Sequence, residues 1–138
     1  MQTSDATPEK TADALRPLMR RPDIQLIILF GSTARGDARR DSDIDVAVLA
    51  VEAFDPISMT NDISGYLGTS CVDVVDLRRA SPLLALEVLR HGRLLYESHP
   101  GNYAAFYSLA LRRYVDTAKL RVAQQQAIRN FLAARGLT

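Results

Sequence analysis

The run Ile24–Phe30 (IQLIILF) constrains the fold more than any other feature of the sequence. Six of its seven residues are apolar, three of them are the β-branched Ile, and the run stops abruptly at Gly31. A short apolar run that ends at a turn residue is typical of a strand buried on both faces of a sheet. Both faces must then be covered, so the run predicts an α/β or α+β domain with a small mixed sheet and flanking helices.

The remaining elements follow from apolar periodicity and from turn residues. Thr7, Asp55 and Ser81 each precede a proline, and such pairs mark helix starts because Thr, Asp and Ser cap a helix and proline is tolerated in its first turn. We expect helices from Pro8 to about 20 with a kink at Pro17, over 56–67, from Pro82 to Gly92 and from Asn102, as the cap, to about 134, with strands over 24–30, 43–49, 71–76 and 94–96.

The length of 138 residues is that of one domain. We therefore expect a single domain over 1–138, with a core at about 24–97 and a long C-terminal helix at about 102–134. Hydrophobic residues make up 47% and charged residues 24% of the chain, which are ordinary values for a globular protein. The net charge of +1 gives no reason to expect attraction to nucleic acid or to an anionic membrane.

Cysteine usage and the N-terminal sequence bear on the compartment. Cys71 is the only cysteine, which excludes an internal disulfide and a cysteine zinc cluster. We interpret Cys71 as a buried small apolar residue in a reducing, cytoplasmic protein. The N-terminus is polar and acidic, unlike a signal peptide, and no apolar run is long enough to span a membrane.

The loop Gly31–Gly36 follows the buried strand and leads into a short helical turn. Its backbone N–H groups can converge on an anion at the positive end of that turn, which suits a phosphate. The spacing G-x-x-x-x-G is that of a P-loop, but Asp37-Ala38 stands where a P-loop has Lys and Ser or Thr. It is not a dinucleotide fingerprint either, since Thr33 replaces the middle glycine.

A pair of carboxylates follows a few residues after the position where a P-loop would have its lysine. Asp43 and Asp45 alternate with Ile44, so on a strand both side chains point to one face, where a divalent cation such as Mg²⁺ would relieve their repulsion. Asp73 on the next strand could complete a three-carboxylate cluster able to hold two ions, although Asp76 is an alternative third acid. Because Asp76 ends its strand, we interpret it as a turn or cap residue and favour Asp73.

These residues carry a resemblance to a known family. Gly31-Ser32, ten further residues and Asp43-Ile44-Asp45 match the G-S-x10-D-x-D signature of the polymerase-β-like nucleotidyltransferase superfamily. The string GSTARGDARRDSDIDVAVL resembles its minimal branch. Downstream, VDVVDLRRASPLLALEVLRHGRLLYE is similar to minimal nucleotidyltransferases of the MntA type, antitoxins paired with HEPN-domain ribonuclease toxins.

The resemblance implies roles for particular residues. Gly31 and Ser32 would bind the nucleotide phosphates, while Asp43, Asp45 and Asp73 would be catalytic and would bind the metal. Family members transfer AMP from ATP to a tyrosine of the partner toxin and so silence it. ATP as the substrate, two Mg²⁺ ions and a HEPN-domain toxin as the partner are therefore expected.

Basic residues near the loop and along the last helix have no single interpretation. Arg35, Arg39 and Arg40 could neutralise triphosphate charge or pair with nearby acids on the surface. Ser42 could orient Asp43 or be a simple turn residue. The basic face and the aromatic residues of the last helix are most simply a solvated face and core residues, although a partner could cover them.

Two other functions remain open from the sequence. One is nucleotidyl transfer to a small hydroxylated molecule such as an aminoglycoside, which would need a further wall around the acceptor. The other is a binding-only antitoxin that blocks its toxin by occlusion. We favour a protein acceptor, because a chain of this size has little surface to enclose a small one.

Overall fold

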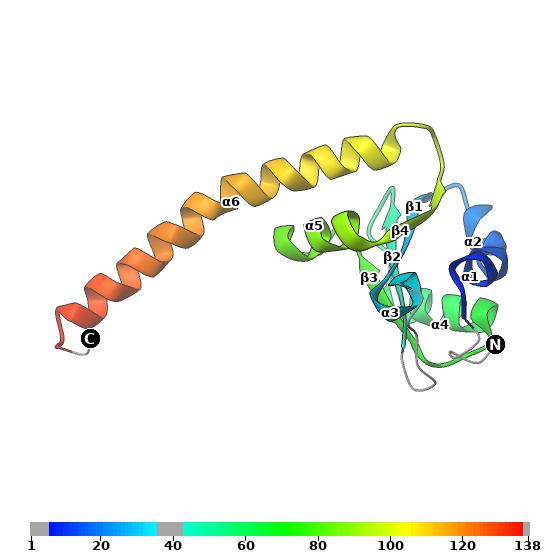
Figure 1. Ribbon diagram of the computed structural model, residues 1–138, viewed down its shortest axis with the longest axis horizontal. Coiled ribbons are helices and arrows are strands. Elements are labelled where there is room, and N and C mark those ends of the chain that lie inside the picture. The colour runs from blue at the N-terminus through cyan, green and yellow to red at the C-terminus, as the bar shows by residue number, and fades with distance from the viewer. Residues whose placement is uncertain (1–5, 36–42, 137–138) are drawn as a thin grey trace.

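The computed structural model describes residues 6–35 and 43–136 of the chain (Figure 1). In chain order its elements are α1 (Pro8–Ala14), α2 (Arg16–Met19), β1 (Ile24–Phe30), α3 (Gly31–Arg35), β2 (Ile44–Ala50), α4 (Pro56–Leu67), β3 (Val72–Asp76), α5 (Pro82–His91), β4 (Arg93–Glu97) and α6 (Asn102–Ala133). The described residues therefore form the mixed α/β structure, with a long C-terminal helix, that the sequence predicts.

The four strands form one mixed sheet in the order β3-β2-β1-β4. The apolar strand β1 is central and pairs antiparallel with both β2 and β4, whereas β2 and β3 run parallel. Because β1 and β2 are antiparallel, the end of β1 lies beside the start of β2, and the residues after Phe30 meet those around Asp45.

Helices cover both faces of this sheet, as the buried run Ile24–Phe30 requires. On one face, buried residues of α2 and α4 and the partly buried Ala14 of α1 pack against Ile27 and Leu29 of β1 and alternate residues of β2. On the other face, α5 and the first half of α6 pack against Leu26, Ile28 and the intervening residues of β2. Side chains of a strand alternate between the faces, so each face receives its own apolar set from a strand that is apolar throughout.

Three predicted helix starts are confirmed by their caps. The side-chain oxygens of Thr7, Asp55 and Ser81 accept hydrogen bonds from backbone N–H groups three residues on, at 3.1, 3.4 and 3.2 Å. Such bonds satisfy N–H groups that the first turn of a helix leaves without a partner. Strand β1 and helix α4 have the predicted bounds, and β2 begins one residue later than predicted.

Two helix predictions were wrong in detail. The first helix does not continue through a kink at Pro17 but ends at Ala14, with Leu15 as its cap, and α2 begins afresh at Arg16, because proline is accommodated in a first turn and not in a helix interior. Asn102 does not cap α6, since Gly101 occupies the cap position with φ 98°. The Asn102 amide instead donates to Ser98 Oγ at 2.9 Å.

Cys71 was wrongly predicted to be buried. It is exposed, because it lies just before the edge strand β3, where no further strand covers it.

Helix α6 packs on the body with its first half and projects beyond it on the β3 side (Figure 1). Within 6–35 and 43–136, none of the helices combines the length and the apolar character needed to cross a membrane.

Candidate active site

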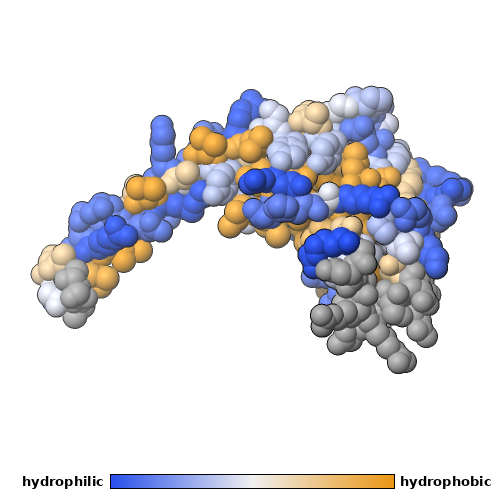
Figure 2. All heavy atoms as spheres, in the orientation of Figure 1, coloured by the Kyte–Doolittle hydropathy of each residue, from blue (hydrophilic) through white to orange (hydrophobic). Residues whose placement is uncertain are grey.

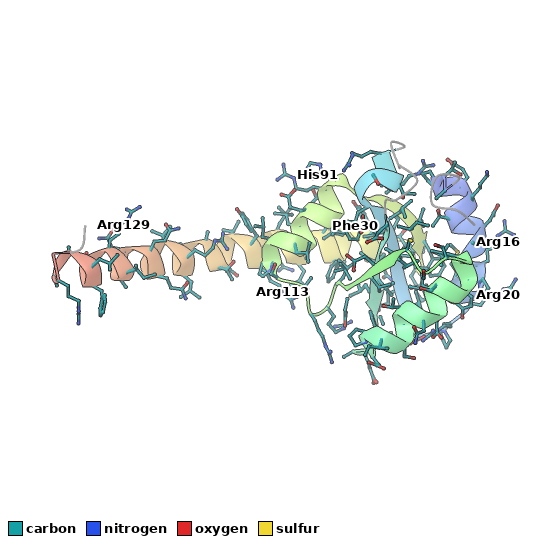
Figure 3. The ribbon with its side chains drawn as sticks, turned by 90° about the horizontal axis from the view of Figure 1, so that it is seen from below. Arg16, Arg20, Phe30, His91, Arg113 and Arg129 are labelled. Carbon is teal, nitrogen blue, oxygen red and sulfur yellow. The ribbon has the colours of Figure 1, made fainter. Side chains whose placement is uncertain are left out.

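The site lies where β1 ends and β2 begins. Helix α3 starts at Gly31, directly after Phe30, and Asp45 is the β2 partner of Phe30 (Figure 3 labels Phe30). The backbone of Gly31 therefore turns away from the sheet immediately beside the carboxylate of Asp45. The antiparallel pairing of β1 and β2 thus places the predicted phosphate loop next to the predicted acidic strand, and only a short stretch of chain separates the two in sequence.

A glycine is required at position 31 by this close approach. Its φ is 72°, a left-handed conformation that residues with a side chain rarely adopt. A methyl group added there would collide with Oδ2 of Asp45 and lie 3.2 Å from its Cγ. The absence of a side chain thus lets the backbone of the loop approach the carboxylate, as a site shared by a phosphate and a cation would need.

Asp73 is the direct neighbour of Asp45 across the parallel strands β2 and β3. The two residues share a face, because Ala47 two residues after Asp45 and Val75 two residues after Asp73 both pack with α5 and α6. Asp73 is exposed and Asp45 half-buried. The parallel register thus brings together the two carboxylates that the sequence could only assign to separate strands.

Asp76 points to the opposite side of its strand and has a structural role. Its Oδ1 accepts the Arg78 backbone N–H at 3.0 Å, and its Oδ2 lies 3.8 Å from Nε of Arg79. Its side chain is only 8% exposed and closes the turn that follows β3. This geometry fits the interpretation of Asp76 as a turn residue and favours Asp73 as the third acid.

The electrostatics of the site centre on Asp45. Burial raises the pKa of its carboxyl group first of all, and the negative charges of Asp73 and Asp43 raise it further, while the positive charge of Arg35 acts in the opposite direction. Because Asp43 and Asp73 are close enough to raise the pKa of Asp45, the three carboxylates form an anionic site whose repulsion a divalent cation would relieve. Among the described residues, no three carboxylate, His or Cys side chains are arranged as a complete metal cage.

The donor set nevertheless fits Mg²⁺. This ion binds proteins through one or two carboxylates and fills its remaining positions with water and substrate phosphate oxygens. Asp43 and Asp45 could supply the carboxylates, and the backbone of Gly31 lies directly against Asp45, so a phosphate held by the N–H groups of the loop would be close to them. A ready-made cage is therefore not needed for this chemistry.

The other predicted site residues lie on α3 or outside the described part. Ser32 is partly exposed in the first turn of α3, and Arg35 is exposed at its end. Thr33, to which the sequence assigns no role in the site, is buried, and its hydroxyl finds no hydrogen-bond partner within the described residues. The predictions for Arg39, Arg40 and Ser42 fall outside 6–35 and 43–136.

A hollow of about 260 Å³ lies at the other end of the strands. Its walls include Leu49, Arg78 and Arg113, and it opens between the start of α6 and the end of β2. Leu49 lies four residues along β2 from Asp45, and the hollow has no acidic side chain among its lining residues. This hollow is therefore distinct from the carboxylate site.

Residues 14–100 match the family model described as polymerase beta, nucleotidyltransferase. This match spans most of the chain and includes every residue of the site described above. The chain belongs to the polymerase beta nucleotidyltransferase family, and the resemblance expected from its sequence is confirmed. The family is one of nucleotidyltransferases, so a nucleotide is the substrate class of this chain.

Two curated relatives are both protein adenylyltransferases MntA. The protein from Aphanizomenon flos-aquae is 31% identical over 136 residues, which covers 90% of this chain and 91% of the relative. The protein from Shewanella oneidensis is 42% identical over 78 residues, 54% of this chain, and that alignment spans about half (55%) of the relative's length.

Solved structures of toxin–antitoxin complexes contain chains of the same fold. A chain from a crystal structure of a toxin–antitoxin complex with AMP-PNP has a TM-score of 0.68 and 32% identity, covering 91% of this chain and 98% of the other. A chain from the complex of tri-AMPylated Shewanella oneidensis HEPN toxin with MNT antitoxin has a TM-score of 0.66 and 28% identity, covering 91% and 99%.

Proposed function

We propose that this chain is an adenylyltransferase that moves AMP from ATP to a tyrosine hydroxyl of a HEPN-domain ribonuclease toxin, and that it is the antitoxin of that toxin. The observation that carries the proposal is the pairing of Asp45 with Asp73 beside Gly31. It receives support from the relatives, which are protein adenylyltransferases, and from similar chains in complexes that contain AMP-PNP or an AMPylated HEPN toxin.

The site residues divide the work by position. The backbone of Gly31 and Ser32 would hold the phosphates of ATP, and Arg35 would balance their charge. Asp43, Asp45 and Asp73 would bind Mg²⁺, and the three carboxylates together would hold two ions. Bound Mg²⁺ would neutralise the triphosphate and lower the pKa of the acceptor hydroxyl.

The reaction is an in-line displacement at the α-phosphorus. The acceptor oxygen forms a bond to that phosphorus, the bond to the bridging oxygen of the β-phosphate breaks, and pyrophosphate leaves with the electron pair. The hydroxyl proton passes to a carboxylate, and the exposure of Asp73 on the edge strand β3 supports assigning this step to it. Asp45 is half-buried beside Gly31, and this position supports a role in binding Mg²⁺ instead.

The proposal extends to organisation and location. We infer that 1–138 acts as one domain, with the catalytic core at about 24–97 and the C-terminal helix at about 102–134. A cytoplasmic location agrees with the need for ATP and with the single exposed thiol of Cys71.

The test is incubation with ATP, Mg²⁺ and a candidate HEPN-domain toxin, followed by the intact mass of the toxin. The toxin should gain the mass of one or more AMP groups, and the gain should disappear when Asp43 and Asp45 are both replaced by Asn. A folded toxin of unchanged mass would reject the proposal. Toxin neutralisation that survives the double replacement would instead establish occlusion as sufficient.

A further inference from the structure

The second half of α6 extends beyond the rest of the protein. Every residue from Lys119 to Phe131 is exposed, although α6 continues unbroken to Ala133. We call Lys119–Ala133 the arm, a segment about 22 Å long at the usual helical rise. Figure 2 shows hydrophobic residues interleaved with hydrophilic ones along it, and Leu120, Ile128 and Phe131 are each more than half exposed.

The arm continues the face with which α6 packs on the body. Ala110 is the buried residue of α6, and Ile128 follows it by 18 residues, which is five full helical turns. Around the helix axis, Phe131 points within about 60° of the direction of Ala110, whereas Val115 and Val122 point about 120–140° away from that direction. The apolar face that the body covers near Ala110 is therefore present on the arm, where nothing in the described part of the chain covers it.

The charge of the arm has one sign. Lys119, Arg121 and Arg129 are its charged residues, Arg135 follows two residues after its end, and no acidic residue occurs over 117–138. Figure 3 shows Arg129 far out on α6, at the opposite end of the molecule from Arg16 and Arg20. Two arms laid together would oppose positive charge with positive charge, so the arm is poorly suited to a second copy of this chain. It suits an apolar groove bordered by carboxylates.

The arm lies on the side of the sheet that carries the acids. Asp45 and Asp73 point to the face covered by α5 and α6, and β3, which carries Asp73, is the edge strand on the side toward which α6 projects (Figure 1). A protein seated against the arm would therefore also face the exposed carboxylate of Asp73. The matches to the two chains from toxin–antitoxin complexes each cover 91% of this chain, and the residues before α6 make up a smaller share than that. Both matches therefore include at least part of α6.

We propose that the arm is the docking surface for the acceptor protein, which meets it with an apolar groove bordered by acidic side chains. This inference rests on the proposed function, since the acceptor is the HEPN-domain toxin. The arm holds the toxin through Ile128 and Phe131, and its arginines steer the approach. Docking at a distance from the phosphate loop allows an enzyme with little enclosing surface to select one protein.

The test compares two pairs of exposed residues on α6. Ile128→Ala with Phe131→Ala removes apolar contact from the proposed docking face, and Val115→Ala with Val122→Ala is the matched control on the other side. Alanine favours the helix in both pairs. The first pair should raise the KM for the toxin at least about tenfold at nearly unchanged kcat, and the control should change it less than about twofold. The affinity for Mg²⁺ and AMP-PNP should stay at the wild-type value in both.

Failure of the docking surface and failure of the proposed function are distinguishable. If wild-type protein binds the toxin without transferring AMP, the function is wrong, and the arm is still tested by the toxin Kd of the two pairs. Equal toxin binding by both pairs would overturn the docking surface. The docking surface would also be overturned if the Ile128→Ala, Phe131→Ala pair bound the toxin as wild type does but lost self-association, measured by light scattering, which would favour a second copy. The same pair losing its binding to a single-stranded RNA oligonucleotide, with toxin binding unchanged, would overturn it in favour of RNA.

Discussion

Replacing Gly31 by Ala tests whether the loop must approach Asp45 as closely as the structure shows. The left-handed backbone at Gly31 costs an L-residue about 1–2 kcal/mol, which for a chain of this length lowers the melting temperature by roughly 3–8 °C. The added methyl group also overlaps Oδ2 of Asp45, so that carboxylate must shift by about 1 Å or change rotamer. A displacement of that size in a catalytic group lowers the rate by about 100-fold.

The assay is a time course of AMP transfer by intact mass at a series of Mg²⁺ concentrations, with thermal unfolding in parallel. Gly31→Ala should transfer AMP about 100-fold more slowly and need more Mg²⁺ for its half-maximal rate. Gly101→Ala is the control, because Gly101 has φ 98° and no atom lies within 4 Å of an added methyl group. It should melt at a lower temperature yet keep the wild-type Mg²⁺ dependence.

One outcome would refute the reasoning. If Gly31→Ala loses stability as Gly101→Ala does but transfers AMP within about threefold of the wild-type rate at every Mg²⁺ concentration, then Asp45 either does not move or does not take part. The close approach would in that case be a feature of folding alone.

Three further predictions concern the acids and the packing of α5. Asp73→Asn should reduce AMP transfer about 100-fold or more, whereas Asp76→Asn should lower the melting temperature and leave the rate unchanged; equal rates in the two variants, measured by intact mass, would exclude Asp73 as the third acid. Because the raised pKa of Asp45 means that the folded state binds a proton more tightly than the unfolded chain, metal-free protein should lose stability as the pH rises through that pKa. Asp45→Asn should therefore be more stable than wild type at pH 7 in EDTA, by at most about 1 kcal/mol because Asp45 is partly exposed, and this difference in the free energy of unfolding should shrink in acid. A difference that does not change with pH would argue against the charge cluster. Gly92→Ala should destabilise the fold by about 1–3 kcal/mol in urea unfolding, because its methyl group would overlap Cγ2 of Ile28, and a neutral effect would show that α5 can move away from β1.

Much of the fold could be predicted because its signals are local. The apolar run Ile24–Phe30 gave a central strand, and hydroxyl or carboxyl caps before proline gave the starts of three helices, since both depend on residues a few positions apart. The details that failed depend on neighbours that are distant in sequence. Cys71 was expected to be buried from its apolar surroundings in the sequence, but the strand order leaves it at an exposed edge.

The sequence by itself determined that Gly31 begins a turn and that Asp45 lies on the strand that follows, because glycine's freedom at positive φ and the apolar pattern of a strand are properties of a few consecutive residues; β2 itself begins at Ile44, so Asp43 lies just before it. Only the tertiary structure decided that Asp73 stands beside Asp45 while Asp76 closes a turn, since the register of two parallel strands joined by α4 is fixed by packing across the whole sheet. The same packing ends partway along α6 and leaves its arm exposed, because the sheet is shorter than the helix that crosses it.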